Sequence, residues 1–238
     1  MRNKGDYQSL MRQASKFKVV KLNDAQAYAA QVTAKTLVLE WGRRTGKTTI
    51  RGYRWREVNR QMPRSSGVFV GPSYKDILSR IIPSIISGLE MFGLYNELHY
   101  FIGKRPPRSW RQTWGTAYMP PEDHSHYITF WTGVGIHLVS QDVKGDGRGL
   151  TTDFVDVDEM SKLNGEKLAS DVFPTMSGTA KKKFKHQPLF GSRLLTGTVA
   201  LDQEGAWYQK IEEKADIDPK RFRFLKATCL LNSENLMD

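Results

Sequence analysis

Short apolar runs of strand length alternate along this chain with longer stretches that have the length and mixed polarity of surface helices. This alternation is typical of βαβ units, in which helices pack on a mostly parallel sheet. We therefore predict an α/β fold with a central sheet flanked by helices. The predicted strands are 36–40, 67–70, 154–157, 194–196 and 222–225. The predicted helices are 24–33, 47–61, 74–91, 165–175 and 203–214.

The pattern changes between residues 98 and 140, where a loop rich in Pro, Arg and Trp comes first. Two apolar runs follow, at 127–131 and 134–139, and Thr132-Gly133 joins them. Two strand-like runs with a short glycine turn between them are typical of a β-hairpin. We predict a β-hairpin insertion at this place.

The most informative segment joins the predicted strand at 36–40 to the predicted helix at 47–61 through a turn that contains glycine. Backbone N–H groups in such a turn, together with the positive end of the helix dipole, bind nucleotide phosphates. Lys47 would reach the β- and γ-phosphates, and the Thr48 hydroxyl would hold Mg²⁺. The predicted nucleotide-binding residues of this turn are Gly42, Arg43, Arg44, Thr45, Gly46, Lys47, Thr48 and Thr49.

This turn departs from the standard phosphate-loop spacing, G-x-x-x-x-G-K-[ST], at one position. Trp41 stands where that spacing has its first glycine, and Gly42 follows one residue later. The alternative interpretation is a basic surface turn, because a G-K-T tripeptide also occurs by chance. The strand before the turn and the helix after it favour a phosphate loop.

A second predicted strand, 154–157, ends in two carboxylates. Asp158 is suited to hold Mg²⁺ through water, and Glu159 is suited to polarise a water molecule for attack on the γ-phosphate. An exposed acidic turn is the alternative for this pair. Asp156 interrupts the apolar run, and from the alternation we interpret it as a solvated or strand-edge carboxylate outside the catalytic set.

Length and charge limit the function further. At 238 residues the chain is long enough for one large α/β domain, and its net charge of +11 favours a polyanionic partner. Neither a membrane-spanning apolar run nor a signal peptide is visible, so we expect a protein that is not secreted. The single cysteine, Cys229, excludes an internal disulfide framework.

A third element narrows the interpretation. Residues 193–198 predict a strand that ends in small hydroxyl residues, and it follows the phosphate loop and the acidic pair in the chain. In this order, residues 22–235 resemble the ATPase domain of the large terminase subunit of tailed bacteriophages and related viruses, the motor that pumps DNA into procapsids. The resemblance implies a P-loop NTPase fold of the ASCE/RecA-like type, with ATP and Mg²⁺ as cofactors. It also implies a coupling motif at Thr196, Gly197 and Thr198 that relays hydrolysis to domain movement.

The resemblance carries over further residues one by one. Gln26 stands where terminases and related helicases place a glutamine that reads adenine, although a polar residue on a capped helix is a nearly equal alternative. Arg148 stands in a glycine-rich loop and is the candidate arginine finger toward a neighbouring subunit's ATP, with Arg43 as a competitor in cis. The predicted catalytic residues are therefore Glu159, Lys47, Arg148 and Arg43.

The resemblance also sets expectations for organisation and partners. It implies an N-terminal helical segment at 1–34, an ATPase core at 35–200, and a C-terminal helix and strand at 201–238. Too few residues follow Thr196 for the nuclease domain of the family, so nuclease activity is not expected in this chain. Expected partners are double-stranded DNA, the portal protein and the small terminase subunit, with a homo-oligomeric ring in the active state and a monomer in isolation as the alternative. The expected location is the host cell cytoplasm.

Basic residues gather in three places that could meet DNA: 43–64, 104–111 and 181–185. Solvated faces are the ordinary alternative for each of them. Two rival functions stay open. One is a helicase-type P-loop ATPase or another DNA translocase of that class, and the other is a non-catalytic DNA-binding module with a vestigial phosphate loop.

Overall fold

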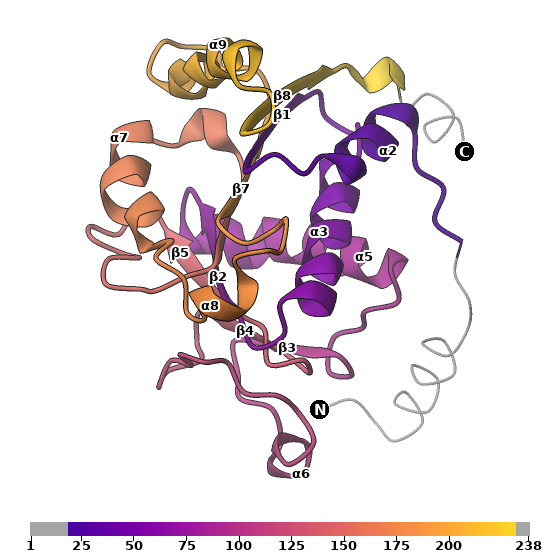
Figure 1. Cartoon of the computed structure of the whole chain (residues 1–238), viewed down its shortest axis with the longest axis vertical. Helices are drawn as coiled ribbons and strands as arrows, with labels where there is room; N and C mark the ends of the chain where they lie inside the picture. The colour runs from indigo at the N-terminus through magenta and orange to yellow at the C-terminus, as the bar shows by residue number, and fades with distance from the viewer. Residues whose placement is uncertain (1–18, 232–238) are drawn as a thin grey trace.

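The computed structural model describes residues 19–231, in which eight strands form a single sheet flanked by helices on both faces (Figure 1). The strand order is β3-β4-β5-β2-β6-β7-β1-β8. The strands are β1 (Thr36–Trp41), β2 (Ser66–Gly71), β3 (Tyr100–Ile102), β4 (Tyr127–Phe130), β5 (Gly135–Ser140), β6 (Phe154–Val157), β7 (Ser192–Gly197) and β8 (Phe222–Ala227). The predicted α/β class with a mostly parallel sheet is confirmed.

Pairing within the sheet is parallel from β5 to β8, and the carboxyl ends of these six strands lie at one edge. Only β3 and β4 run antiparallel to their neighbours. The predicted hairpin is present as β4 and β5, and its second strand pairs in parallel with β2. The hairpin therefore extends the main sheet rather than standing apart from it. Strand β3 is too short for the sequence pattern to reveal, and it was not predicted.

The helical segments agree with the predicted ranges to within a few residues. Their bounds are α2 (Asp24–Gln31), α3 (Lys47–Gln61), α4 (Tyr74–Asp76), η1 (Ile77–Ile81), α5 (Ile82–Met91), α6 (Arg108–Arg111), η2 (Met160–Lys162), α7 (Gly165–Lys167), η3 (Leu168–Val172), η4 (Phe173–Thr175), α8 (Lys181–Phe184), η5 (Gly205–Gln209) and α9 (Lys210–Ile217). Two predicted helices contain π-helical turns, η1 and η3, and the short α6 and α8 were not predicted.

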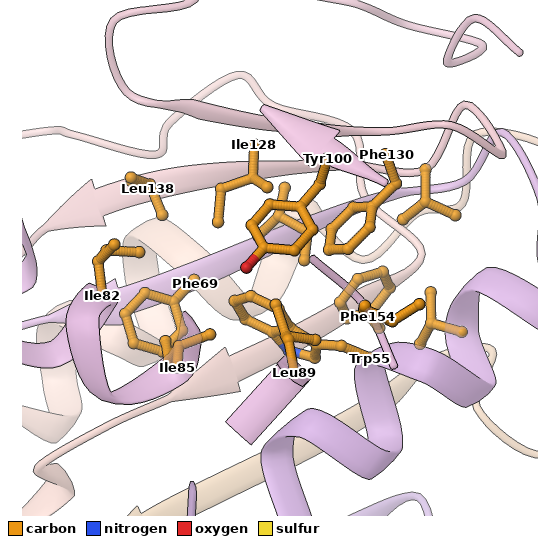
Figure 2. Close-up of a cluster of buried hydrophobic side chains, with 14 of the residues drawn as sticks. Trp55, Phe69, Ile82, Ile85, Leu89, Tyr100, Ile128, Phe130, Leu138 and Phe154 are labelled. Carbon is orange, nitrogen blue, oxygen red and sulfur yellow. The ribbon is translucent and has the colours of Figure 1, made fainter. Parts of the chain in front are cut away.

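One face of the sheet carries the largest apolar cluster, which α3 and α5 cover (Figure 2). Trp55 of α3 lies at its centre and contacts Phe69 and Phe130 edge-on, with ring centroids 5.9 and 6.4 Å apart. The opposite face packs against η2, η3 and η5 through a second cluster that includes Leu168, Val172 and Tyr208. The sheet is thus buried on both faces, as parallel sheets require.

Helix α3 is fixed against α5 by two glycines. A Cβ atom at Gly52 would lie 2.6 Å from the carbonyl oxygen of Gly88, and a Cβ atom at Gly88 would lie 2.8 Å from the carbonyl oxygen of Thr48. Any side chain at either position would push the helices apart. The close approach places the first turn of α3, which follows the predicted phosphate loop, in a fixed position.

Among the described residues, no helix combines the length and the apolar character needed to cross a bilayer.

Candidate nucleotide-binding site

The predicted site residues come from three strands that end side by side. Strand β7 lies between β1 and β6, so the loop after β1, the acidic pair after β6 and the end of β7 are neighbours. Leu39 of β1 is level with Thr196 of β7, and Val157 of β6 is level with Leu195. The parallel register therefore brings Asp158 beside Thr196 and both beside the loop that begins at Gly42.

The loop between β1 and α3 is held by backbone geometry. The Gly42 N–H donates to the Ala227 carbonyl of β8 (2.8 Å), and the Thr45 hydroxyl donates to the Gly42 carbonyl (2.9 Å). Gly46, just before α3, has φ +91°, which favours glycine, and Arg44 has φ +60° although it carries a side chain. Strained backbone of this kind is concentrated at functional turns.

Lys47 is the first residue of α3, and its side chain folds back over the loop. Its Nζ donates to the carbonyl oxygens of Trp41 (2.7 Å) and Gly42 (2.9 Å). Burial lowers the pKa of Lys47, and the negative charges of Asp158 and Glu159 oppose that shift. The ammonium therefore lies within electrostatic reach of both predicted acidic residues.

Trp41 closes β1 and does not belong to the loop itself. Its indole is 1% exposed and packs with Leu39, Ile50 and Leu194 in a third apolar cluster. The position at which the standard spacing has its first glycine is therefore a core position at the end of β1. The loop itself runs from Gly42 to Gly46.

Gln26 packs directly on the loop. Its side-chain oxygen accepts the Asn23 N–H (2.9 Å) in a capping box at the start of α2, and its Nε2 donates to the Gly46 carbonyl (3.4 Å). Asn23 also donates to the Thr45 carbonyl (3.4 Å). Gln26 therefore takes part in the cap of α2, as the alternative interpretation expected. Recognition of adenine by Gln26 stays a prediction.

The hydroxyls of the first turn of α3 meet α5. Thr48 Oγ1 lies 3.1 Å from Ser84 Oγ, and Thr49 Oγ1 donates to the Met91 sulfur (3.8 Å). Thr49 is buried, whereas Thr48 is partly exposed. Of these two hydroxyls, only that of Thr48 is placed to meet a ligand.

Asp158 is bound by two groups that both contact its Oδ1. The Thr196 hydroxyl donates to it (2.6 Å), and an Arg51 Nη2 lies 3.1 Å away. Burial would raise the pKa of Asp158, but the charge of Arg51 and the hydrogen bonds from Thr196 and Arg51 outweigh it and hold that pKa below its ordinary value. Asp158 is therefore ionised at neutral pH.

Asp156 was wrongly interpreted as a solvated carboxylate. It is 2% exposed, and its oxygens accept hydrogen bonds from Arg51 Nε (3.1 and 2.9 Å) and from Trp55 Nε1 (2.9 Å). The error has a physical reason: β6 is a central strand of a sheet covered on both faces, so alternation does not bring any of its side chains to solvent. Arg51 also donates to Thr196 (2.7 Å). One buried arginine thus joins Asp156, Asp158 and Thr196.

The sequence carried one signal for this network. Lys47, Arg51 and Trp55 are spaced four residues apart on α3 and share one helix face. Because α3 packs on β6, the residues of this face that follow Lys47 can contact a buried carboxylate of β6.

Glu159 follows Asp158 with a left-handed backbone, φ +52°, and precedes η2. Its side chain is 36% exposed, and Oε2 lies 3.3 Å from Lys162 Nζ. A bulky residue in this region of φ is uncommon. The turn thus ends β6 and leaves the Glu159 carboxylate partly exposed beside Lys162.

The predicted coupling motif connects the site to η5. Gly197 packs so closely on Met160 that a Cβ atom would lie 2.9 Å from its Cγ. Trp207 of η5 donates to the Met160 carbonyl (3.0 Å), and the Thr198 carbonyl lies 3.3 Å from the Tyr208 hydroxyl.

Tyr208 also reaches back toward the phosphate loop. Its hydroxyl donates to the Glu40 carboxylate (2.8 Å), which is buried one residue before Trp41, and accepts the Ala200 N–H (3.1 Å). Neither tyrosine nor glutamate was singled out in the sequence.

Arg148 lies apart from these residues. Its guanidinium is 63% exposed and pairs with Asp171 of η3, with Nη2 2.8 Å and Nε 2.9 Å from Oδ1. It lines a hollow beyond the ends of β2 and β5 with Lys144 and Lys167. Arg43, by contrast, is exposed on the loop and within electrostatic reach of Lys47.

The basic stretch at 43–64, one of three candidate DNA contacts in the sequence, does not form a single exposed surface. Arg51 and Arg54 are 1% and 6% exposed, and burial lowers the pKa of Arg54 to about 10. Arg56 and Arg60 both pair with Glu57. Part of the positive charge of α3 is therefore buried inside the fold.

No protein-family model and no curated protein matches this sequence. Solved structures do match. The chain is similar to the large terminase ATPase domain of Thermus phage P74-26, with 16% identity and a TM-score of 0.53 over 100% of this chain and 90% of that one. The fold is that of a large-terminase ATPase domain.

Two further terminase structures agree. The large terminase of the thermophilic bacteriophage D6E in complex with ADP matches 90% of this chain with 13% identity and a TM-score of 0.57. The large terminase of bacteriophage HK97 matches 92% of this chain with 13% identity and a TM-score of 0.53. This chain spans less than half of either protein, 47% and 43%. Both comparisons thus support the same fold.

Proposed function

We propose that this chain hydrolyses ATP and that hydrolysis drives the translocation of double-stranded DNA into a viral procapsid. One observation carries the proposal. A backbone-held loop before α3 lies at the same sheet edge as an ionised aspartate and a glutamate, and a buried arginine joins that aspartate to the end of β7. The fold shared with a terminase ATPase domain and with a large terminase solved with ADP supports the same function.

Each residue has a distinct role in this proposal. Residues 42–48 bind the phosphates, and Lys47 turns from the Trp41 and Gly42 carbonyls to the β- and γ-phosphates. Glu159 takes the proton of the attacking water. Gln26 contacts the adenine edge from the start of α2.

The residues present fit Mg²⁺. Within residues 19–231 no cluster of three or more His, Cys, Asp or Glu could hold a metal by itself, and Mg²⁺ typically needs only one or two protein oxygens beside substrate phosphates and water. The Thr48 hydroxyl and the ionised Asp158 carboxylate supply such oxygens. When bound, the ion would neutralise charge that develops on the phosphate oxygens.

Glu159→Ala, together with the isosteric Glu159→Gln, is expected to lower kcat for ATP by about 100-fold or more, because the proton acceptor is lost. The dissociation constant for ATP should stay within about threefold, since Glu159 contacts no phosphate in this proposal. Phosphate release and titration with a fluorescent ATP analogue measure the two quantities. Glu166→Gln, on exposed α7, is the matched control. Turnover that survives Glu159→Ala would remove Glu159 as the base.

Arg148 acts in trans in this proposal, and its exposure and its pairing with Asp171 of η3 support that role. Arg148→Ala subunits with intact Glu159, mixed with Glu159→Ala subunits with intact Arg148, should recover ATP hydrolysis that neither variant shows alone. Phosphate release from mixed rings is the measurement, with ring formation checked by light scattering. Rings that form without recovered activity would contradict the role and favour Arg43 in cis.

The assembly is part of the same proposal. The chain forms a single ATPase domain that works as a homo-oligomeric ring in the host cytoplasm, with the portal protein and the small terminase subunit as partners. In this proposal, a change of position at Asp158 moves the coupling motif at Thr196, Gly197 and Thr198. The contacts of Met160 and Tyr208 transmit that movement to η5.

A further inference from the structure

A group of exposed cations lies at the edge of the sheet opposite the phosphate loop, where the parallel strands begin. Arg64 lies two residues before the start of β2 at Ser66. The segment that carries α8 is bound at the starts of two other strands, because the Gly178 N–H donates to the Thr152 carbonyl before β6 and Lys35 before β1 donates to the Phe190 carbonyl. In Figure 1, α8 and α6 lie in the lower half of the molecule, and α2 beside the phosphate loop lies in the upper half.

Tyr118 contacts both Arg64 and Lys183 of α8, so the cations of these two segments form one surface. Its ring lies 4.4 Å below the guanidinium of Arg64, and its N–H donates to the Arg64 carbonyl (3.0 Å). Its hydroxyl accepts from Lys183 Nζ (3.1 Å), and its ring contacts Phe184, which anchors α8 in the core. The remaining side chains of α8 therefore point outward. We define the basic face as Arg64, Lys181, Lys182, Lys183 and Lys185, all exposed.

The basic face has no exposed counter-charge of its own. The three segments that build it, residues 58–75, 98–121 and 172–201, contain no Asp or Glu. Within residues 19–231, none of the five cations forms an ion pair with a carboxylate. Asp153 lies beneath the surface, where Ser66 and Thr179 bind it, and it is 0% exposed.

We propose that the basic face binds the phosphate backbone of duplex DNA. The choice of DNA among polyanions rests on the proposed function, and the location rests on the structure. A duplex presents one negative charge per about 1.7 Å of its axis, so several unpaired cations on one surface meet several phosphates at once. The guanidinium of Arg64 lies over the Tyr118 ring, 4.4 Å from its centroid, and occupies the place where an unpaired base would stack on that face. This favours a duplex over a single strand.

Helix α3 links the two anion sites. It begins at Lys47 in the phosphate loop and ends at Gln61, three residues before Arg64. Fifteen residues of α-helix span about 22 Å, so DNA on the basic face and ATP at the loop do not compete for space. DNA binding is therefore expected to survive saturation with nucleotide.

The test is a charge-neutralising triple variant, Lys181→Gln, Lys182→Gln and Lys185→Gln, which leaves both contacts to Tyr118 intact. Its affinity for a fluorescent 30-base-pair duplex, measured by anisotropy, should fall at least about tenfold at 0.1 M salt. The slope of log affinity against log salt should fall by about 2–3, since each lost phosphate contact removes about 0.9. The control variant Lys210→Gln, Lys214→Gln and Lys220→Gln has the same net charge, lies near α9, and should bind within about twofold of the unmodified chain.

Two outcomes overturn the proposal. Equal losses in the two triple variants would mean that net charge alone attracts DNA, and no loss in the α8 variant would place the contact elsewhere. Tighter binding of a single strand or an RNA duplex through the α8 lysines would overturn the choice of partner. ATP hydrolysis in the same preparations separates the two claims. An α8-dependent duplex affinity without hydrolysis would refute only the proposed function, and hydrolysis without α8 dependence would refute only the basic face.

Discussion

Arg51→Met is expected to lower the free energy of unfolding by about 3–5 kcal/mol, because it leaves a buried carboxylate without its cation. Arg51 is 1% exposed and is the ionic partner of both Asp156 and Asp158. Urea denaturation at neutral pH measures the loss. The deficit should shrink on acidification, since burial already raises the pKa of Asp156 and removal of Arg51 raises it further. A carboxyl group whose pKa is raised on folding destabilises the fold progressively as pH rises from its unfolded pKa to its native pKa, and the destabilisation is absent below the unfolded pKa.

Two further variants separate the effect of the lost charge on stability from the effect of the lost packing. Arg51→Met combined with Asp156→Asn should recover part of the lost stability, because no unpaired charge remains. Arg51→Lys keeps a cation but lacks the planar fork that reaches Asp156, Asp158 and Thr196 together. If Arg51 positions Asp158, Arg51→Lys should lower kcat about tenfold or more while ATP still binds. An Arg51→Met protein within about 1 kcal/mol of the unmodified chain would contradict the network.

Lys47→Ala is expected to abolish nucleotide binding at working concentrations. Lys47 is the only lysine in residues 42–48. A hydrogen bond to a charged group contributes about 1.5–3 kcal/mol, or roughly 10- to 100-fold in affinity. Turnover should fall by a further 100-fold or so, because charge that develops on the γ-phosphate loses its nearest cation. Titration with a fluorescent ATP analogue gives the binding loss directly.

Lys75→Ala is the matched control for Lys47, since Lys75 is an exposed lysine on α4 away from the loop. It should bind and hydrolyse ATP as the unmodified chain does. Equal nucleotide affinity in the Lys47 and Lys75 variants would mean that residues 42–48 do not bind phosphate.

The parts of the fold that the sequence predicted are those set by local chemistry. Glycine, Lys47 and Thr48 between an apolar strand and a helix suffice to indicate a phosphate loop, because backbone N–H groups and the helix dipole form most of such a site. The ends of β6 and β7 were predicted for the same reason: polar residues closing buried strands of a parallel sheet gather at one edge. Seven strands, including the two of the hairpin, and five helical segments follow from the pattern of apolar runs and turn residues.

What the sequence did not predict depends on which surfaces are buried after folding. Asp156 appeared solvated because alternation carries no information in a strand covered on both faces. Arg51 and Arg54 appeared to belong to a DNA surface, because charge in a sequence does not tell a buried arginine from an exposed one. The partnership of Asp158 with Thr196 needed the strand order, in which β7 lies between β1 and β6.

The central claim is that the loop at 42–48 hydrolyses ATP with Glu159 as the base. Release of phosphate from MgATP by the full chain, with and without duplex DNA, tests it most directly when Lys47→Ala and Glu159→Ala are assayed in parallel. We expect release by the unmodified chain and none above background by either variant, with ATP still bound by Glu159→Ala. A chain that binds DNA but releases no phosphate in a Lys47-dependent manner would be a DNA-binding module with a vestigial phosphate loop, and it would contradict the account.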